Sequence, residues 1–204
     1  MAKRATPRQF MSIEEYLAFE RASLIKHEYV GGHLYAMVGV SPHSRIAGNI
    51  FVSLREAARS SSCRVHQSDM QVPVPDGPYY YPDVVVSRID EPEDPYLEDE
   101  PCLIVEVLSP HTALTDRREK LIAYRKLPSL QTYLIVEQEG MLVERRFRDQ
   151  DGRWHSEFIN DGGVLVPCPP GTQFSLAEIY EGLQVRAAQE DCPHSPGTNA
   201  VLAQ

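Results

Sequence analysis

The sequence lacks any run of about 18 apolar residues, so it offers no candidate membrane span. Its charged first ten residues are not followed by the apolar segment of a secretory signal. Its four cysteines, Cys63, Cys102, Cys168 and Cys192, lack the close pairs that a zinc cluster or a redox dithiol needs. These absences predict a cytoplasmic protein with reduced thiols and no membrane partner.

The sequence also lacks a surplus of positive charge, since its net charge is −9. This argues against a protein that simply coats nucleic acid, because such affinity comes from Lys and Arg side chains. The charge is unevenly distributed. Residues 1–60 and 112–148 each carry 8 basic and 5 acidic side chains, whereas 61–111 carry 2 and 11, and 149–204 carry 2 and 8. Basic character therefore belongs to two segments that are predicted to be mainly helical.

The length of 204 residues and the 42% hydrophobic content suit a single well-buried core. We expect one domain over residues 11–186, a disordered N-terminus at 1–10 and a disordered C-terminal tail at 187–204. No internal repeat or linker interrupts the domain. Seven acidic residues between Asp90 and Glu100 predict a solvated loop.

Capping and periodicity predict the elements of this domain. Helices are expected from Ser12, from Ser41-Pro42 to about Ser60, and from Thr115 to the stop at Pro128. Gly31-Gly32 predicts a tight hairpin. The extended segments are 27–30, 33–38, 63–74, 81–87, 102–108, 131–137, 141–148, 154–159 and 164–166, with a last short helix at 175–182. This order predicts an α/β sheet core with an antiparallel extension.

The most informative feature is Glu106, a carboxylate inside the apolar strand 102–108. A buried lone charge costs several kcal/mol, so Glu106 needs a cation, a proton or a hydrogen-bond donor. Asp83 opens the preceding apolar strand, and residues two apart in a strand share a face. If the two strands are neighbours, both carboxylates meet on one face. Two carboxylates there can bind Mg²⁺, with Mn²⁺ as a substitute, and leave positions for phosphate and water.

A helix follows these strands, and Asp116, Lys120 and Tyr124 share one of its faces. A lysine at Lys120 can orient an attacking water or stabilise developing negative charge. Tyr124 is a candidate contact to substrate. His43 lies near the start of an earlier helix and is a candidate contact to substrate or to a metal-bound water. The basic groups at 112–126, Arg117 among them, are a candidate phosphate-binding surface.

The ordered combination of these motifs resembles a bacterial family of restriction-endonuclease-like proteins within the PD-(D/E)XK nuclease superfamily. It comprises Pro82-Asp83, the segment from Glu106 to Pro110, then Asp116, Lys120 and Tyr124. The stretch with Glu28, Gly31-Gly32 and His43 is similar too. The resemblance implies a restriction-endonuclease-like mixed β-sheet core flanked by helices, with Asp83 and Glu106 as metal ligands. Glu28 would match the additional acidic residue of the superfamily, and a homodimer is expected.

The sequence departs from the superfamily pattern at one position, because Leu108 stands where a lysine is expected two residues after Glu106. In the narrower family the lysine lies on the helix, which here means Lys120. The leading hypothesis is a magnesium-dependent endonuclease acting on DNA, with Asp83, Glu106, Lys120 and Glu28 as catalytic residues. The alternatives are a catalytically inactive nucleic-acid-binding or assembly module with the same fold, and a metal-dependent hydrolase of another phosphate ester.

Overall fold

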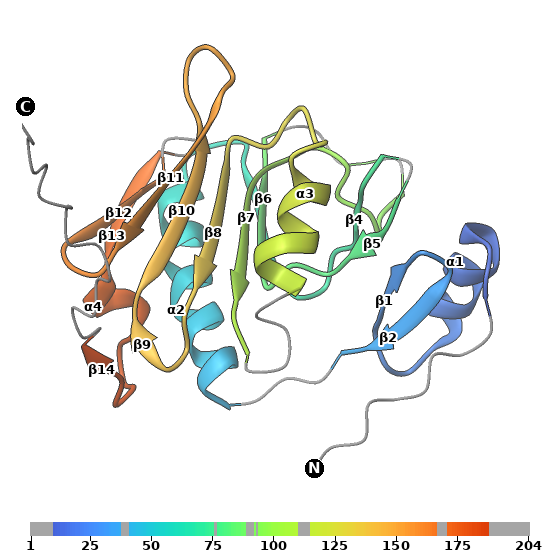
Figure 1. Ribbon diagram of the computed structural model, residues 1–204, viewed down its shortest axis with the longest axis horizontal. Helices are drawn as coiled ribbons and strands as arrows, with labels where there is room; N and C mark the ends of the chain where they lie inside the picture. Colours follow the sequence, from blue (N-terminus) through green and yellow to red (C-terminus); the bar gives the residue numbers. More distant parts are fainter. Residues whose placement is uncertain are drawn as a thin grey trace, which may run out of the picture.

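A six-stranded mixed sheet forms the centre of the protein, with helices on both of its faces and a smaller β-layer beside it (Figure 1). The computed structural model describes residues 10–37, 41–75, 77–88, 92, 94–109, 115–166 and 171–187, with the backbone alone at 115–117 and 186–187. The predicted disordered ends, 1–10 and 187–204, lie outside these residues except for Phe10 and Ala187. The α/β fold with a mixed sheet is as predicted.

The helices are α1 (Ile13–Ala22), α2 (Ser41–Ala58), the π-helix η1 (Thr115–Lys120), α3 (Leu121–Tyr124) and α4 (Leu176–Ile179). The strands are β1 (His27–Val30), β2 (His33–Ala36), β3 (Arg64–Gln67), β4 (Val72–Pro73), β5 (Tyr79–Tyr80), β6 (Val84–Ser87), β7 (Pro101–Val107), β8 (Thr132–Val136), β9 (Gly140–Met141), β10 (Val143–Arg148), β11 (Trp154–Ile159), β12 (Gly163–Val166), β13 (Thr172–Ser175) and β14 (Arg186–Ala187).

The central sheet has the strand order β11-β10-β8-β7-β6-β3. Its middle strands β6, β7 and β8 are buried along their whole length, as their continuous apolar sequences require. β7 runs parallel to β8, and the other neighbours in the sheet are antiparallel. The parallel pair is possible because η1 and α3 supply the crossover between β7 and β8.

The two faces of the sheet pack on different helices, because successive residues of a strand point to opposite sides. Leu103, Val105 and Val107 contact the apolar stripe of α2, which includes Ile46 and Ile50. Ile104 and Leu108 belong instead to the cluster under α3. Figure 1 shows α2 and α3 on opposite sides of the sheet. Glu106 is two residues after Ile104 in the strand, so its side chain points to the same face, the one covered by α3.

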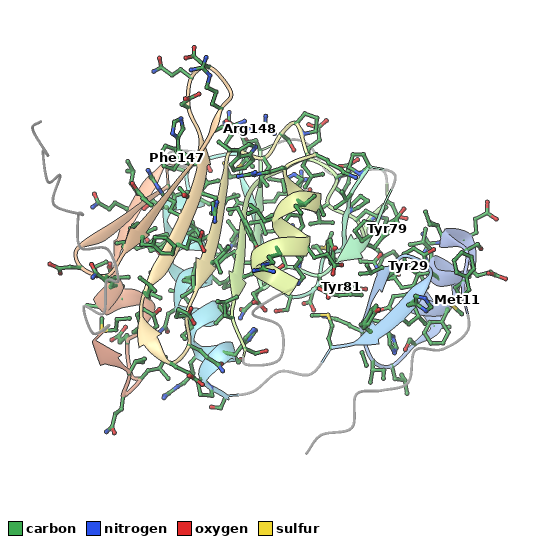
Figure 2. The ribbon with its side chains drawn as sticks, in the orientation of Figure 1. Met11, Tyr29, Tyr79, Tyr81, Phe147 and Arg148 are labelled. Atoms are coloured by element: carbon green, nitrogen blue, oxygen red, sulfur yellow. The ribbon has the colours of Figure 1, made fainter. Side chains whose placement is uncertain are left out.

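The N-terminal layer is a second sheet, with the order β2-β1-β5-β4. Ser12 caps α1 as predicted, and together with Glu15 it forms a capping box. Both Gly31 and Gly32 adopt positive φ in the β1–β2 hairpin, which confirms the predicted tight turn. The ring of Tyr29 stacks on Tyr16 with centroids 4.9 Å apart. Figure 2 shows Tyr29 and Tyr79 in this layer, remote from Phe147 and Arg148 on β10.

Two predictions of local structure are wrong. The extended segment 63–74 is broken at Ser68, whose φ of 56° lies in the left-handed region, so β3 and β4 belong to different sheets. The acidic loop is not solvated throughout: Glu98 is fully buried and pairs with Arg64 at 2.7 Å. A long-range partner removes the cost of burying this carboxylate, and local composition does not reveal such a partner.

Some elements near the C-terminal end also differ from those predicted. The segment 141–148 is divided into β9 and β10. The strand β13, which pairs with β12 in an antiparallel ribbon, was not predicted. The predicted helix at 175–182 is shorter, since α4 ends at Ile179. Among the described residues, no helix has the length and apolar character needed to cross a membrane.

Candidate active site

Two buried carboxylates face each other across β6 and β7. The antiparallel register pairs Val84 with Val105 and Val85 with Ile104, so the next step places Asp83 opposite Glu106. The backbone N–H of Val107 donates to Asp83 Oδ2 at 2.7 Å, which ties the start of β6 to the end of β7. Asp83 and Glu106 are only 6% and 4% exposed. The predicted meeting of these carboxylates on one face is therefore present.

Lys120 supplies a buried cation to this site from the last residue of η1. Its Nζ lies 2.8 Å from Glu28 Oε1 and 3.1 Å from Glu106 Oε1, so the lysine bridges two carboxylates. Glu28 comes from β1 of the N-terminal sheet, whereas Glu106 comes from the central sheet. Leu108, where the superfamily pattern expects lysine, is buried in the core under α3. Lys120 thus reaches Glu106 from the helix, as the resemblance implies.

Two tyrosines hold this lysine and its partner in place. The Tyr124 hydroxyl donates to Glu106 Oε1 at 2.8 Å, and its side chain is fully buried. Burial, together with the nearby charge of Glu106, raises the pKa of Tyr124 well above its ordinary value, so the hydroxyl remains a donor. The ring of Tyr80 lies under Lys120, with Nζ 5.3 Å from its centroid. The hydroxyl of Tyr124, a candidate substrate contact from the sequence, is directed at Glu106.

His43 approaches the same site from the first turn of α2. Its Nε2 lies 3.2 Å from Asp83 Oδ2, and its side chain is 20% exposed. The predicted residues Asp83, Glu106, Lys120, Glu28, Tyr124 and His43 therefore converge on one site. The side chain of Arg117 lies outside the described residues. Tyr80 was not singled out from the sequence, although the run Tyr79-Tyr80-Tyr81 directly before Pro82-Asp83 was a usable signal.

The donor set fits a hard divalent cation such as Mg²⁺. No described group of three or more His, Cys, Asp and Glu side chains has an arrangement that would enclose a metal ion. Mg²⁺, however, commonly binds through one or two carboxylates and completes its coordination with waters and substrate phosphate. Asp83, Glu106 and Glu28 outnumber Lys120, so ionised carboxylates leave this group of four side chains with excess negative charge. Asp83 and Glu106 are the residues that would hold the cation.

Comparison with known proteins agrees with this arrangement. A family model described as "Uma2: Putative restriction endonuclease" matches residues 13–185, which include all these site residues. An uncharacterised protein of Synechocystis sp. is 33% identical over 178 residues, covering 85% of this chain and 93% of that protein. A second uncharacterised Synechocystis protein is 30% identical over 155 residues, covering 72% and 85%.

A solved structure shares the fold. It is described as "a putative nuclease belonging to DUF820" from Anabaena variabilis, and it superposes with a TM-score of 0.68. The match covers 83% of this chain and 97% of the Anabaena chain at 18% sequence identity. The architecture of the sheet and its helices is therefore common to both proteins.

Proposed function

Because the chain belongs to the Uma2 family, described as "Putative restriction endonuclease", we propose that it hydrolyses phosphodiester bonds of DNA as a metal-dependent endonuclease. The family model and the nuclease-like structural neighbour support a nuclease. The proposal further specifies DNA as the substrate and magnesium as the cofactor. The observation that carries it is the buried pair of Asp83 and Glu106 with Lys120 beside it.

The side chains of the site have distinct tasks in this proposal. Asp83 and Glu106 would hold Mg²⁺, which when bound lowers the pKa of a water and offsets charge on the phosphate. Lys120 orients the attacking water and stabilises negative charge that develops on the phosphate oxygens. Glu28 fixes the Lys120 ammonium from the other side, and Tyr124 fixes the Glu106 carboxylate. His43 orients Asp83 and contacts substrate at the partly open edge.

Cleavage of plasmid DNA in Mg²⁺, Mn²⁺ or EDTA tests this function directly. Asp83→Asn and Glu106→Gln keep the side-chain shape and remove a ligand charge, so each should abolish metal-supported cleavage. Asp151→Asn in the β10–β11 turn and Glu56→Gln on the exposed face of α2 are matched controls, and they should cleave normally. Equal cleavage by the wild type and both site variants would refute the assignment.

Soaking crystals with Mn²⁺ provides a test that does not depend on turnover. Density within about 2.0–2.4 Å of both Asp83 and Glu106 is expected, because those are ordinary metal–oxygen distances. Density elsewhere, with neither carboxylate in contact, would remove these residues from the metal site.

One observation favours a second function, a catalytically inactive nucleic-acid-binding or assembly module. Lys120 already forms ion pairs with Glu28 and Glu106, and a closed network of this kind can serve structure alone. Calorimetry separates the two functions: a folded protein that binds no Mg²⁺ at millimolar concentration would support the module. Profiling against other phosphate esters tests whether the substrate is a different ester.

The proposal includes two copies of the chain acting together on DNA in the cytoplasm. β11 is an edge strand of the central sheet, and an edge strand can pair with a second copy. Light scattering should give twice the mass of the 204-residue chain, and a monomer at all concentrations would refute the dimer.

A further inference from the structure

A cavity of about 330 Å³ lies between α1, the loop that follows it, and the segment 94–97. The site residues described above do not line it. Its size falls within the range of small-molecule pockets, which is about 300–1,000 Å³. Leu24 and Ile25 form part of its rim and are strongly exposed, at 103% and 58%. An exposed apolar rim of this kind favours a ligand with an apolar surface.

Two tyrosines of the cavity lining each lie next to a cation. The guanidinium of Arg21 lies over the Tyr96 ring at 5.6 Å and pairs with Asp94 at 2.6 Å. Lys26 Nζ lies over the Tyr81 ring at 5.7 Å. Tyr96 is 59% exposed, so its ring can stack with a planar ligand, whereas Tyr81 is 7% exposed and belongs to the inner wall.

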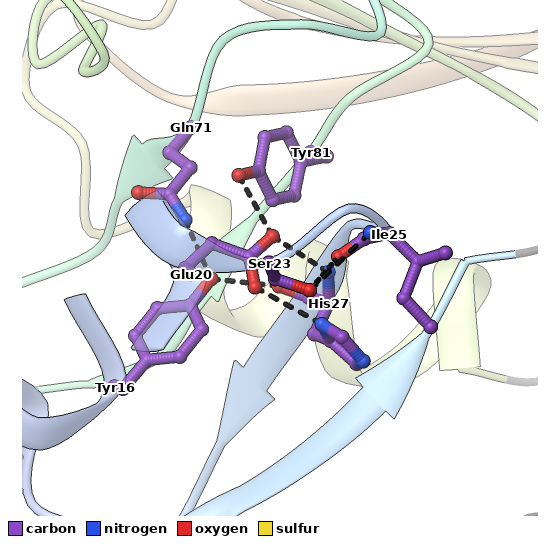
Figure 3. Close-up of polar contacts among 7 residues, drawn as sticks. All are labelled: Tyr16, Glu20, Ser23, Ile25, His27, Gln71 and Tyr81. Atoms are coloured by element: carbon purple, nitrogen blue, oxygen red, sulfur yellow. Dashed lines mark hydrogen bonds and ion pairs between the residues drawn. The ribbon is translucent and has the colours of Figure 1, made fainter. Parts of the chain in front are cut away.

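Buried hydrogen bonds fix the inner wall of the cavity. Glu20 Oε1 accepts from the backbone N–H of His27 at 2.8 Å and from the Tyr81 hydroxyl at 3.1 Å, and Glu20 Oε2 lies 3.0 Å from His27 Nδ1 (Figure 3). In the same view, Gln71 donates to the Tyr16 hydroxyl at 2.5 Å. The ring of Tyr81 is therefore held in one orientation before any ligand enters.

The charges of the lining favour a neutral ligand over an anion. Both cations already pair with carboxylates, Arg21 with Asp94 and Lys26 with Asp69. Glu20 is satisfied by His27 and Tyr81, so it does not demand a cationic ligand. The lining displays hydrogen-bond donors and acceptors together. A planar, uncharged molecule with donors and acceptors on its edge matches this combination, and a nucleobase has that chemistry.

Two segments of the chain connect the cavity to the candidate active site. Tyr81 and Lys26 of the cavity lie two residues before Asp83 and Glu28, at most about 7 Å away along an extended chain. Nucleotides of one strand succeed each other every 3.4 Å or so along a duplex axis. A nucleotide close to the cleaved phosphate is thus within reach of the cavity.

We propose that this cavity binds one nucleobase of the nucleic-acid substrate, from a nucleotide next to the phosphodiester that is cleaved. The inference rests on the proposed nuclease function for its substrate. The base leaves its stack, enters past Leu24 and Ile25, and packs against the exposed ring of Tyr96. The cavity then contributes to the choice of cleavage position.

Titration of the ¹⁵N-labelled full chain with trinucleotides in EDTA tests base binding without cleavage. Four DNA trinucleotides differ only in the base of the central nucleotide, and a fifth has an abasic central nucleotide. A base-containing trinucleotide should shift the amide signals of Lys26, Gln71 and Tyr96, and the abasic one should not. Tyr96→Ala should weaken binding by about five- to 150-fold, the range expected for one lost stacking contact. Tyr35→Ala removes an exposed tyrosine outside the cavity and should bind normally.

The outcomes separate this inference from the function on which it rests. The base pocket is overturned if the amide signals do not move at millimolar trinucleotide, or if the abasic trinucleotide shifts them equally. If the same protein cleaves DNA in Mg²⁺, the nuclease function still stands. Base-dependent shifts that Tyr96→Ala weakens, in a protein that cleaves nothing, support the pocket and overturn the nuclease.

Discussion

Lys120 contributes to the charge balance of the candidate site and to the proposed cleavage reaction. It lies between Glu28 and Glu106, and the carboxylates around it outnumber it. Lys120→Met should therefore lower cleavage by at least about 100-fold, the lower range for losing one preorganised charge-stabilising group. Divalent-cation affinity should not fall, because the carboxylates keep their charge and lose a competing cation.

Cleavage rates and Mn²⁺ calorimetry on the same Lys120→Met sample measure these two effects separately. Lys126→Met, which alters an exposed lysine just after α3, serves as the control and should change neither. Normal cleavage by Lys120→Met would remove this lysine from the mechanism.

Tyr124 acts through Glu106, since its buried hydroxyl donates to that carboxylate and does not face solvent. Tyr124→Phe removes a hydrogen bond to a charged group and should cost about 1.5–3 kcal/mol of unfolding free energy. A positioning role predicts a lower kcat with an unchanged KM, because substrate binding does not use this hydroxyl. Tyr35→Phe is the matched control on the surface. A rise in KM alone would show that Tyr124 contacts substrate.

At the scale of elements, the pairing of Arg64 on β3 with Glu98 joins the edge of the central sheet to the acidic loop. Arg64→Met leaves the fully buried Glu98 carboxylate with only His66, whose Nε2 lies 3.5 Å away, and should lower the unfolding free energy by about 3–5 kcal/mol. Arg59→Met breaks the exposed ion pair with Glu56 and should cost less than about 0.5 kcal/mol. Urea denaturation of both variants measures the difference. Equal stabilities would mean that Glu98 is satisfied without Arg64.

Features that follow from the periodicity of strands and helices were predictable from the sequence. Alternation along β6 and β7 predicted the meeting of Asp83 and Glu106, because the side-chain period of a strand is fixed at two. Helical spacing likewise predicted that Lys120 and Tyr124 share a face, and both reach Glu106. The break at Ser68 and the burial of Glu98 were not predictable in this way. Both depend on tertiary contacts, which local propensity does not contain.

At the scale of the whole molecule, buried tyrosines couple stability to alkaline pH. Burial is the largest cause raising the pKa of Tyr16, Tyr80, Tyr81, Tyr124 and Tyr180. A raised folded pKa means that the folded state holds the proton more tightly than the unfolded chain does. The resulting stability is complete below the unfolded value of about 10 and is lost as pH rises above it toward the folded values.

Urea unfolding at pH 8, 9, 10 and 10.5 should therefore show a steep fall in unfolding free energy only at the last two points. Tyr180→Phe should make the fall shallower, because it removes one of the coupled protons. The tyrosinate absorbance of these buried tyrosines should appear together with loss of structure. Full ionisation of these tyrosines in a protein that stays folded would contradict the prediction.

The bridge that Lys120 makes between the two sheets also sets when the candidate site is complete during synthesis of the chain. Glu28, His43 and Asp83 leave the ribosome first, Glu106 follows, and the helix with Lys120 and Tyr124 comes last. A nascent or prematurely terminated chain that stops before residue 120 holds the carboxylates without the cation between them. Such fragments therefore hold an incomplete site, and under the proposed function they should not cut DNA.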